Sequence, residues 1–429
     1  MPGGRVYDLF EPPSRPARAD GLPVYLRCAA LAGITASILC VLSAVYASLV
    51  PSLRVVFDVW FGADSPRYIV YAEGLSVASR AHWHPFVWVL YKVLGVPLAV
   101  LGVAKSSMPL PYFALPSILT VSAVATVAAQ VVVAGTKRLA YIPLAVAVTL
   151  LLGSALVFGP VPESHIVGGG GLLLLGLMQI GISGNESGRS GHWALVPVAA
   201  LAVGASLSNA VAVLLQVSVS PVLRDSIAKR RKLAVAATLL LAAVTLTIWS
   251  LERRQDASFS PLTALSHESA YIGAPGLPDF AFVCEKLVVN QFGVPQTAVC
   301  GTSLQTKPTL EPLQVAALIF WVVGILCTVW GTMKRNSHWA LALASWLLAY
   351  VALLIFHSFY DAQEAFLFSG HAWPFVVLPA LLAFKGALTS RAMRVACRFH
   401  LASVALSAVQ TAVAFPVFLE NMRRLPGPW

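Results

Sequence analysis

The chain has 429 residues, of which 58% are hydrophobic and 11% are charged, and its formal net charge is +11. A soluble core cannot account for this composition, which indicates a polytopic membrane protein. The basic residues stand in short clusters between apolar runs, a pattern that argues against a nucleic-acid-binding surface.

The first 24 residues are rich in proline and polar side chains, and the apolar run that follows is too long for a cleaved signal peptide. We therefore expect residues 1–24 to form a cytoplasmic tail. Runs of about 20 apolar residues predict membrane-spanning helices. These runs lie at 25–50, 112–135, 139–159, 165–183, 193–206, 207–222, 233–251, 313–333, 338–356, 373–388 and 399–419. The predicted fold is an all-α polytopic bundle of about eleven transmembrane helices, since the ten-residue alternation of a β-barrel is absent.

Segment 84–103 is long and apolar enough to count as another span, but the basic residues favour a helix that lies in the outer membrane interface. With this assignment, the basic clusters all fall on the cytoplasmic side, at 137–138, 224–232, 334–335 and 385–398. Trp88, Tyr91 and Lys92 suit an interfacial position near lipid headgroups. The short segments 193–206 and 207–222 are each near the lower limit for a span, and a re-entrant hairpin is the alternative.

Residues 25–419 are predicted to form one transmembrane domain, followed by the tail 420–429. Two large segments of it face outward, a first outward loop at 51–111 with interfacial helices and a second at 252–312. No soluble domain of ordinary size remains, so any chemistry is expected at the membrane surface. Cys284 and Cys300 fall in the second loop, and we predict a disulfide between them.

Ionisable side chains gather at helix ends on the predicted outward face. Such groups are costly in a membrane and are therefore candidates for function. They are Asp58 and Asp64 in FDVWFGADSPRY, His82 and His84 in RAHWHPF, Glu163 and His165 in GPVPESH, and Asp361, Glu364 and His371 in FYDAQEAFLFSGH. Because they are far apart in the sequence, only the fold could bring them together.

Structural roles are the alternative for several of these residues. Asp64 and Glu163 each stand beside a proline that suits the start of a helix, where a negative charge is stabilising. His82 and His84 would point apart on a helix, which argues against a metal site. The glycines at 168–171 favour close packing of helix backbones over a groove for a prenyl chain.

The order of these motifs resembles the GT-C superfamily of integral membrane glycosyltransferases, particularly bacterial members of the RgtA/ArnT/dolichyl-mannosyltransferase type. The matching pieces are FGADSPRY, the HPF at 84–86, VPESH at 161–165 and FYDAQEAFLFSGHAWP at 359–374. The sequence departs from the family where GADSPRY replaces a simpler pair of acidic residues and where HPF replaces HPL. It also lacks the large carboxy-terminal soluble domain of some members.

The resemblance implies an inverting transfer of a sugar from a polyprenyl-phosphate carrier to a lipid, glycan or protein acceptor. It implies a location in the bacterial plasma (inner) membrane, with the chemistry at its outer face. The acceptor hydroxyl needs a general base, which would be Asp64 with Asp58 as its rival. The departing phosphate is an anion that needs cations or hydrogen-bond donors, for which the candidates are Arg67, His82, His84 and Lys92. Further substrate-binding candidates are Glu163, His165, Asp361, Glu364 and His371. The sequence requires no metal, and a divalent cation stays an open alternative.

A secondary transporter is the competing hypothesis from another class. It predicts internal symmetry and ionisable groups near the bilayer midplane, whereas the acidic residues here stand at helix ends. A membrane acyltransferase is a third hypothesis, for which a histidine inside the membrane would be expected.

Overall fold

A computed structural model describes residues 21–54, 84–104, 108–136, 138–182, 195–206, 209–218, 242–250, 277–307, 310–334, 337–360, 368–388 and 390–425. It also describes the isolated positions 66, 68–69, 72, 235–236, 238–239, 253, 260, 266, 272–273 and 366. Within these residues, six helices are long and apolar enough to cross a membrane, as expected of an integral membrane protein.

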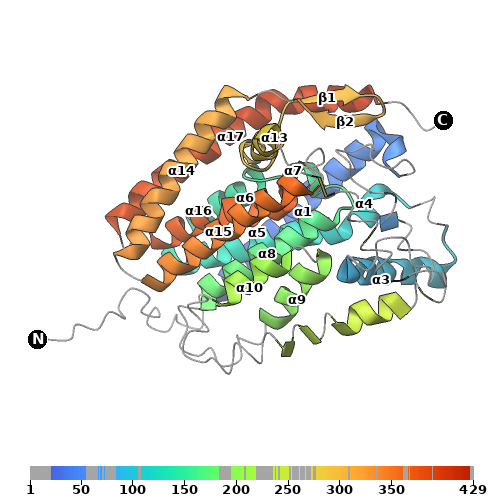
Figure 1. Ribbon diagram of the computed structural model, residues 1–429, viewed down its shortest axis with the longest axis horizontal. Coiled ribbons are helices and arrows are strands. Elements are labelled where there is room, and N and C mark those ends of the chain that lie inside the picture. The colour runs from blue at the N-terminus through green and yellow to red at the C-terminus, as the bar shows by residue number, and fades with distance from the viewer. Residues whose placement is uncertain are drawn as a thin grey trace, which may run out of the picture.

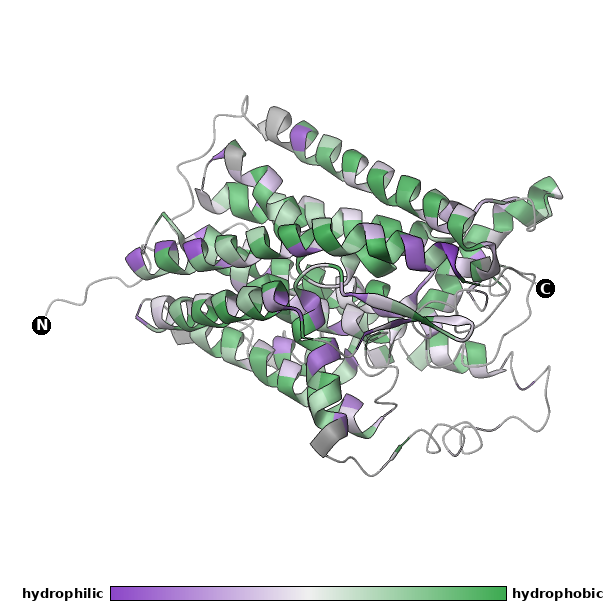
Figure 2. Ribbon diagram, turned by 90° about the horizontal axis from the view of Figure 1, so that it is seen from above, coloured by the Kyte–Doolittle hydropathy of each residue, from purple (hydrophilic) through white to green (hydrophobic). Residues whose placement is uncertain are grey.

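Seven long helices of the described chain pack together as a bundle (Figure 1). They are α1 (Gly21–Leu49), α5 (Leu115–Thr136), α8 (Ser164–Ile182), α14 (Pro312–Met333), α15 (Ser337–Phe359), α16 (Ser369–Gly386) and α17 (Arg391–Arg423). All but α16 are candidate membrane spans. Figure 2 shows hydrophobic residues along most of the length of the helices. Many large hydrophobic side chains of the bundle are exposed, among them Leu326, Leu348 and Val413, which suits a lipid environment.

Shorter elements connect and cover the bundle. The helices among them are η2 (Pro51–Arg54), α3 (Pro85–Leu101), α4 (Leu110–Phe113), η5 (Leu139–Tyr141), α6 (Ile142–Leu151), α7 (Ala155–Phe158), α9 (Leu195–Ala205), α10 (Ala210–Ser218), α13 (Leu277–Leu287) and η8 (Val289–Gln291). Two strands, β1 (Thr297–Cys300) and β2 (Ser303–Thr306), form an antiparallel hairpin. The all-α prediction therefore holds for the bundle but missed this hairpin in the second outward loop.

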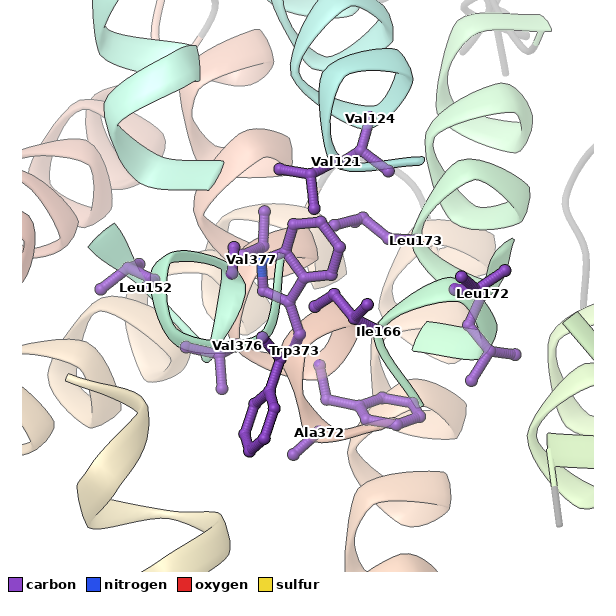
Figure 3. Packing of buried hydrophobic residues seen from close by; sticks show 14 of the residues in the cluster. Val121, Val124, Leu152, Ile166, Leu172, Leu173, Ala372, Trp373, Val376 and Val377 are labelled. Carbon is purple, nitrogen blue, oxygen red and sulfur yellow. The ribbon is translucent and has the colours of Figure 1, made fainter. Parts of the chain in front are cut away.

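The centre of the bundle is α16, in which every residue from Ser369 to Lys385 is buried. Its Trp373 lies among valines and leucines of neighbouring helices (Figure 3), and the indole Nε1 donates to the Thr149 carbonyl at 3.0 Å. The glycines at 168–171 let α8 approach α16 closely, since a Cβ at Gly169 would lie 1.8 Å from the Gly370 carbonyl oxygen. The predicted packing role of this glycine run is confirmed.

Four predicted spans correspond to one helix each, namely 25–50, 165–183, 313–333 and 338–356. The span predicted at 112–135 corresponds to α5, but its first two residues belong to α4. The helix predicted at 399–419 begins earlier, at Arg391, because the Ser390 side chain caps it by accepting from the backbone N–H of Met393 at 3.4 Å. The helix predicted at 373–388 likewise begins earlier, at Ser369. Of the span predicted at 233–251, residues 235–236, 238–239 and 242–250 are described and helical.

The predicted span 139–159 is wrong as a single helix, because α6 ends at Leu151 and α7 starts at Ala155. Gly153 stands between them with φ +88, which favours glycine, and its N–H donates to the Gln291 carbonyl at 2.6 Å. Part of the second outward loop therefore hydrogen-bonds into the break, a tertiary contact that hydropathy does not reveal.

In the segments 193–206 and 207–222, the residues that the structure describes form α9 and α10, with 11 and 9 residues. At 1.5 Å per residue, each is about half the length needed to cross a 30 Å hydrocarbon core. Two complete spans are therefore not seen in the described part of these segments, and the total of about eleven spans is not confirmed. The re-entrant hairpin stays a prediction.

The predicted disulfide is absent, because Cys284 and Cys300 are both free thiols. Cys284 is partly buried on α13, where burial raises the pKa of its thiol. Cys300 is exposed at the turn of the β-hairpin, beside Gly301, which adopts φ +62. The hairpin carries Cys300 toward solvent, whereas the helix holds Cys284 against the bundle.

Helix ends meet in two groups. At one end, His165 at the start of α8 contacts His371 at the start of α16. At the other, Lys385 near the end of α16 packs against Gly135 of α5 and donates to the carbonyl of Ile180 on α8. The three helices α5, α8 and α16 therefore run in the same direction, and we call the end that contains the histidines the outer end. Which side of a membrane it faces stays a prediction.

Candidate functional site

A buried polar cluster lies at the outer end of the bundle, around the Glu163 carboxylate. Glu163 is 1% exposed, and its Oε1 accepts from the backbone N–H of His165 at 3.1 Å. The Ser164 hydroxyl donates to the same oxygen at 3.2 Å. The Tyr68 hydroxyl lies 2.8 Å from Ser164 Oγ and 3.2 Å from Glu163 Oε1, so its single proton is shared between these two acceptors. Hydrogen bonds of this kind favour the charged form of a carboxylate.

The position of Glu163 follows from the local sequence. Pro162 and Glu163 directly precede α8, so the carboxylate stands at the positive end of that helix. The backbone N–H of Glu163 donates to the Ser117 hydroxyl at 3.3 Å, which fixes the residue against α5. The helix-start role considered from the sequence is therefore present, together with contacts that the sequence did not suggest.

Two histidines from distant motifs meet beside this carboxylate. The Nδ1 of His165 lies 3.0 Å from the Nε2 of His371, a separation at which one ring donates and the other accepts. His165 Nε2 also lies 3.9 Å from Glu163 Oε1, an ion pair whenever that imidazole is protonated. The predicted VPESH and SGH motifs are thus brought into contact by the fold.

His84 lies next to this pair, with its ring centre 5.8 Å from that of His165. Its Nδ1 is 2.7 Å from the Ala205 carbonyl oxygen, and because a carbonyl only accepts, Nδ1 carries the proton. Phe86 packs onto Gly204, where a Cβ would meet the Phe86 ring at 1.8 Å. The HPF motif therefore docks the start of α3 onto the end of α9.

The buried face of α3 turns Trp88 and Tyr91 into the protein. They are 7% and 0% exposed, so the expectation that these two rings sit at lipid headgroups is wrong. Lys92 is partly exposed, with its ammonium 5.3 Å from the centre of the Trp88 ring, and burial lowers the pKa of Lys92 to about 8. The exposed face of α3 carries Val93, Val96, Val100 and Leu101. This apolar face is compatible with an interfacial helix, which stays a prediction.

The structure describes five of the eleven predicted site residues. Four of these come together in the cluster, namely Glu163, His165, His371 and His84. Lys92 lies on α3, two turns after His84. The other six lie outside the described residues, and they are Asp58, Asp64, Arg67, His82, Asp361 and Glu364.

Sequence reasoning missed two members of the cluster, Tyr68 and His357. Tyr68 follows the ADSPR motif and donates to Glu163, and its ring stacks on Tyr91 with centres 5.4 Å apart. His357 is buried at the end of α15, stacked on Phe368 at 4.0 Å. Tyr68 is the last residue of the recognised FGADSPRY motif, and His357 stands two residues before FYDAQEAFLFSGHAWP. Both were therefore within reach of the sequence argument, which considered only the charged residues of the first motif.

Among the described residues, no group of three or more histidine, cysteine, aspartate or glutamate side chains is arranged to hold a metal ion. The cluster instead offers a charged acceptor and imidazoles that can donate or accept. Glu163 is the acceptor at the centre of this network, a position that suits it to hold hydroxyl groups.

No protein-family model matches the chain, and no curated protein matches it. Among solved structures, the chain is similar to the apo form of the oligosaccharyltransferase of Archaeoglobus fulgidus. The TM-score is 0.46 and the sequence identity 13%, over 92% of this chain and 56% of that chain. The chain thus spans little more than half the length of that protein.

Proposed function

We propose that this protein is a membrane glycosyltransferase that moves a sugar from a polyprenyl-phosphate carrier to a lipid, glycan or protein acceptor at the outer face of the membrane. The observation that carries the proposal is the convergence of motifs at the outer end. Glu163 and His165 of the VPESH motif contact Tyr68, which follows ADSPR, and His371 of the SGH motif. These are the motifs, hundreds of residues apart, whose order resembles the GT-C superfamily.

The proposed division of roles follows from the chemistry of the cluster. Asp64, with Asp58 as its rival, would take the proton of the acceptor hydroxyl as it attacks the anomeric carbon with inversion. Glu163, His165 and His371, with Asp361 and Glu364, would hold substrate hydroxyls. The carrier phosphate leaves as an anion without taking a proton, so it needs cationic partners.

Arg67, His82, His84 and Lys92 are those proposed partners. His84 Nδ1 already donates to Ala205, so His84 must be protonated to donate to a phosphate through its other nitrogen. Lys92 carries its charge without such a requirement below about pH 8.

The test is incubation of the purified protein, in lipid nanodiscs, with a panel of polyprenyl-phosphate sugars and simple hydroxyl acceptors. Release of polyprenyl phosphate together with a glycosylated product would support the proposal. Proteoliposomes that move a lipid-linked or small solute without cleaving any sugar–phosphate bond would instead favour the transporter hypothesis.

A further inference from the structure

Two hydrogen-bond donors on the buried face of α3 have no partner among the described residues. They are the indole Nε1 of Trp88 and the hydroxyl of Tyr91. The two residues are three apart on the helix and so lie on the same face. Burying a polar group without a partner is costly, so such groups call for an explanation.

Most comparable groups in the bundle do have partners. Trp321 and Trp373 donate to backbone carbonyls at 2.9 and 3.0 Å, and Tyr46 donates to one at 3.2 Å. The indoles of Trp249 and Trp346 also lack a partner among the described residues, and Trp346 lies about 16 Å along α15 from His357. The α3 pair differs from Trp346 because it stands beside the polar cluster.

Contacts with Tyr68 and Glu163 tie the α3 pair to that cluster. Tyr68 stacks on Tyr91 with ring planes inclined by 26°, and the Tyr68 hydroxyl donates to Glu163. Burial raises the pKa of Tyr91, and the negative charge of Glu163 raises it further, so the carboxylate acts on this hydroxyl. Aromatic faces, two donors and a carboxylate acceptor thus occupy one region.

This set of groups matches a sugar better than a phosphate. A sugar hydroxyl both donates and accepts, so it can accept from an indole N–H and donate to a carboxylate, while the C–H face of the sugar packs on an aromatic ring. A phosphate only accepts when fully ionised, and the charge of Glu163 would repel it. Lys92, whose ammonium lies over Trp88, supplies the cation on the adjoining turn.

We propose that Trp88 and Tyr91 bind the hydroxyls of the donor sugar, with the carrier phosphate directed toward Lys92. The inference rests on the proposed function and assigns the part of the site that distinguishes a sugar-bearing carrier from a bare one. Because both donors are buried, a sugar reaches them only after a local opening of the outer end.

The test compares Trp88→Phe and Tyr91→Phe, which remove one donor each and keep an aromatic ring. Binding constants are measured for polyprenyl phosphate, polyprenyl-phosphate mannose and polyprenyl-phosphate glucose. The wild type is expected to bind a sugar-bearing carrier more tightly than the bare carrier. Each variant should weaken the sugar-bearing carrier about 3- to 10-fold, the range for one neutral hydrogen bond, and leave the bare carrier unchanged.

The stability of the ligand-free variants separates binding from a structural role. Removal of an unpartnered buried donor also removes its desolvation cost, so the Tm of Tyr91→Phe should stay the same or rise. Tyr141→Phe, a partly buried tyrosine of η5 at the opposite end, is the matched control and should change neither Tm nor binding.

The outcomes distinguish the two proposals. If the wild type discriminates sugar-bearing from bare carriers and both variants keep that discrimination, the sugar assignment falls and the glycosyltransferase proposal stands. If each variant lost affinity equally for all three lipids, Trp88 and Tyr91 would be contacts of the carrier phosphate, and the sugar assignment would again be overturned. If the wild type binds none of these lipids, both proposals fall.

A cross-linking experiment on the wild type tests the same proposal without any variant, in case the variants do not fold. A polyprenyl-phosphate sugar with a photoreactive diazirine on the sugar ring is cross-linked to the protein, and the labelled peptides are identified by mass spectrometry. Labelling within residues 85–101 is expected. Labelling confined to other segments would overturn the inference.

Discussion

Replacing Gly169 with alanine should separate the two helices that bring the histidines of the site together. A Cβ at this position would lie 1.8 Å from the Gly370 carbonyl oxygen, and an ordinary contact begins at 3.4 Å. Neither the Cβ of residue 169 nor the Gly370 carbonyl oxygen can move by a side-chain rotation, because both are fixed to the backbone of buried helix ends. We therefore expect α8 and α16 to move apart by about 1.5 Å, at a cost of about 1–3 kcal/mol for overpacking.

The same shift carries to the site, because His165 and His371 stand on these two helices near the contact. Their ring nitrogens are 3.0 Å apart, and a separation of about 4.5 Å no longer permits a hydrogen bond. Gly169→Ala should therefore lower both the thermal stability in detergent and the sugar-transfer rate.

Gly181→Ala on the same helix is the matched control, since its Cβ would meet only a valine methyl at 3.6 Å. Unchanged stability and transfer in Gly169→Ala would refute the reasoning, because the helices would then have room that the structure does not show.

Three further predictions concern single polar groups. Tyr68→Phe keeps the ring stack but removes a hydroxyl that donates to a buried carboxylate, so the free energy of unfolding should fall by about 1.5–3 kcal/mol. Denaturation in mixed micelles measures this change, and an unchanged free energy would mean that Tyr68 does not hold Glu163. Asp64→Asn should lower transfer about 10²–10⁴-fold with carrier binding retained, and a loss confined to Asp58→Asn would move the base to that residue. Lys92 is charged below its pKa of about 8 and neutral above it, so affinity for polyprenyl phosphate should fall as the pH rises through about 8. Lys92→Arg should keep that affinity at higher pH, and the same decline in this variant would exclude Lys92 as its cause.

Hydropathy located the long helices because each has about 20 apolar residues, the property that a membrane selects. It failed where tertiary contacts decide the structure. The break at Gly153 depends on a hydrogen bond to Gln291, which is 138 residues further along the chain. The rings of Trp88 and Tyr91 were assigned to headgroups because aromatic residues are common there. Both are instead buried in the protein, Tyr91 against the ring of Tyr68.

The candidate site shows a similar division between what local sequence reveals and what only packing reveals. Charged residues at helix ends are conspicuous in an apolar chain, so Glu163, His165 and His371 were recognised. Tyr68 carries no charge at neutral pH and was missed, although it donates to the carboxylate at the centre of the cluster. Uncharged donors are invisible to an argument based on the cost of burying charge, and they become visible only when the partner of each buried acceptor is known.

The glycine run at 168–171 sets the geometry of the site. Residues 168–171 begin one turn after His165, so the close approach of α8 to α16 lies directly beside the histidine contact. A side chain at Gly169 would meet the Gly370 carbonyl, and a side chain at Gly370 would meet the backbone of His165 at 2.7 Å. Because each glycine excludes a side chain from the same interface, the backbone itself sets the distance between the imidazoles. Small residues that hydropathy treats as part of a membrane span therefore position the polar groups that we propose to bind the substrate.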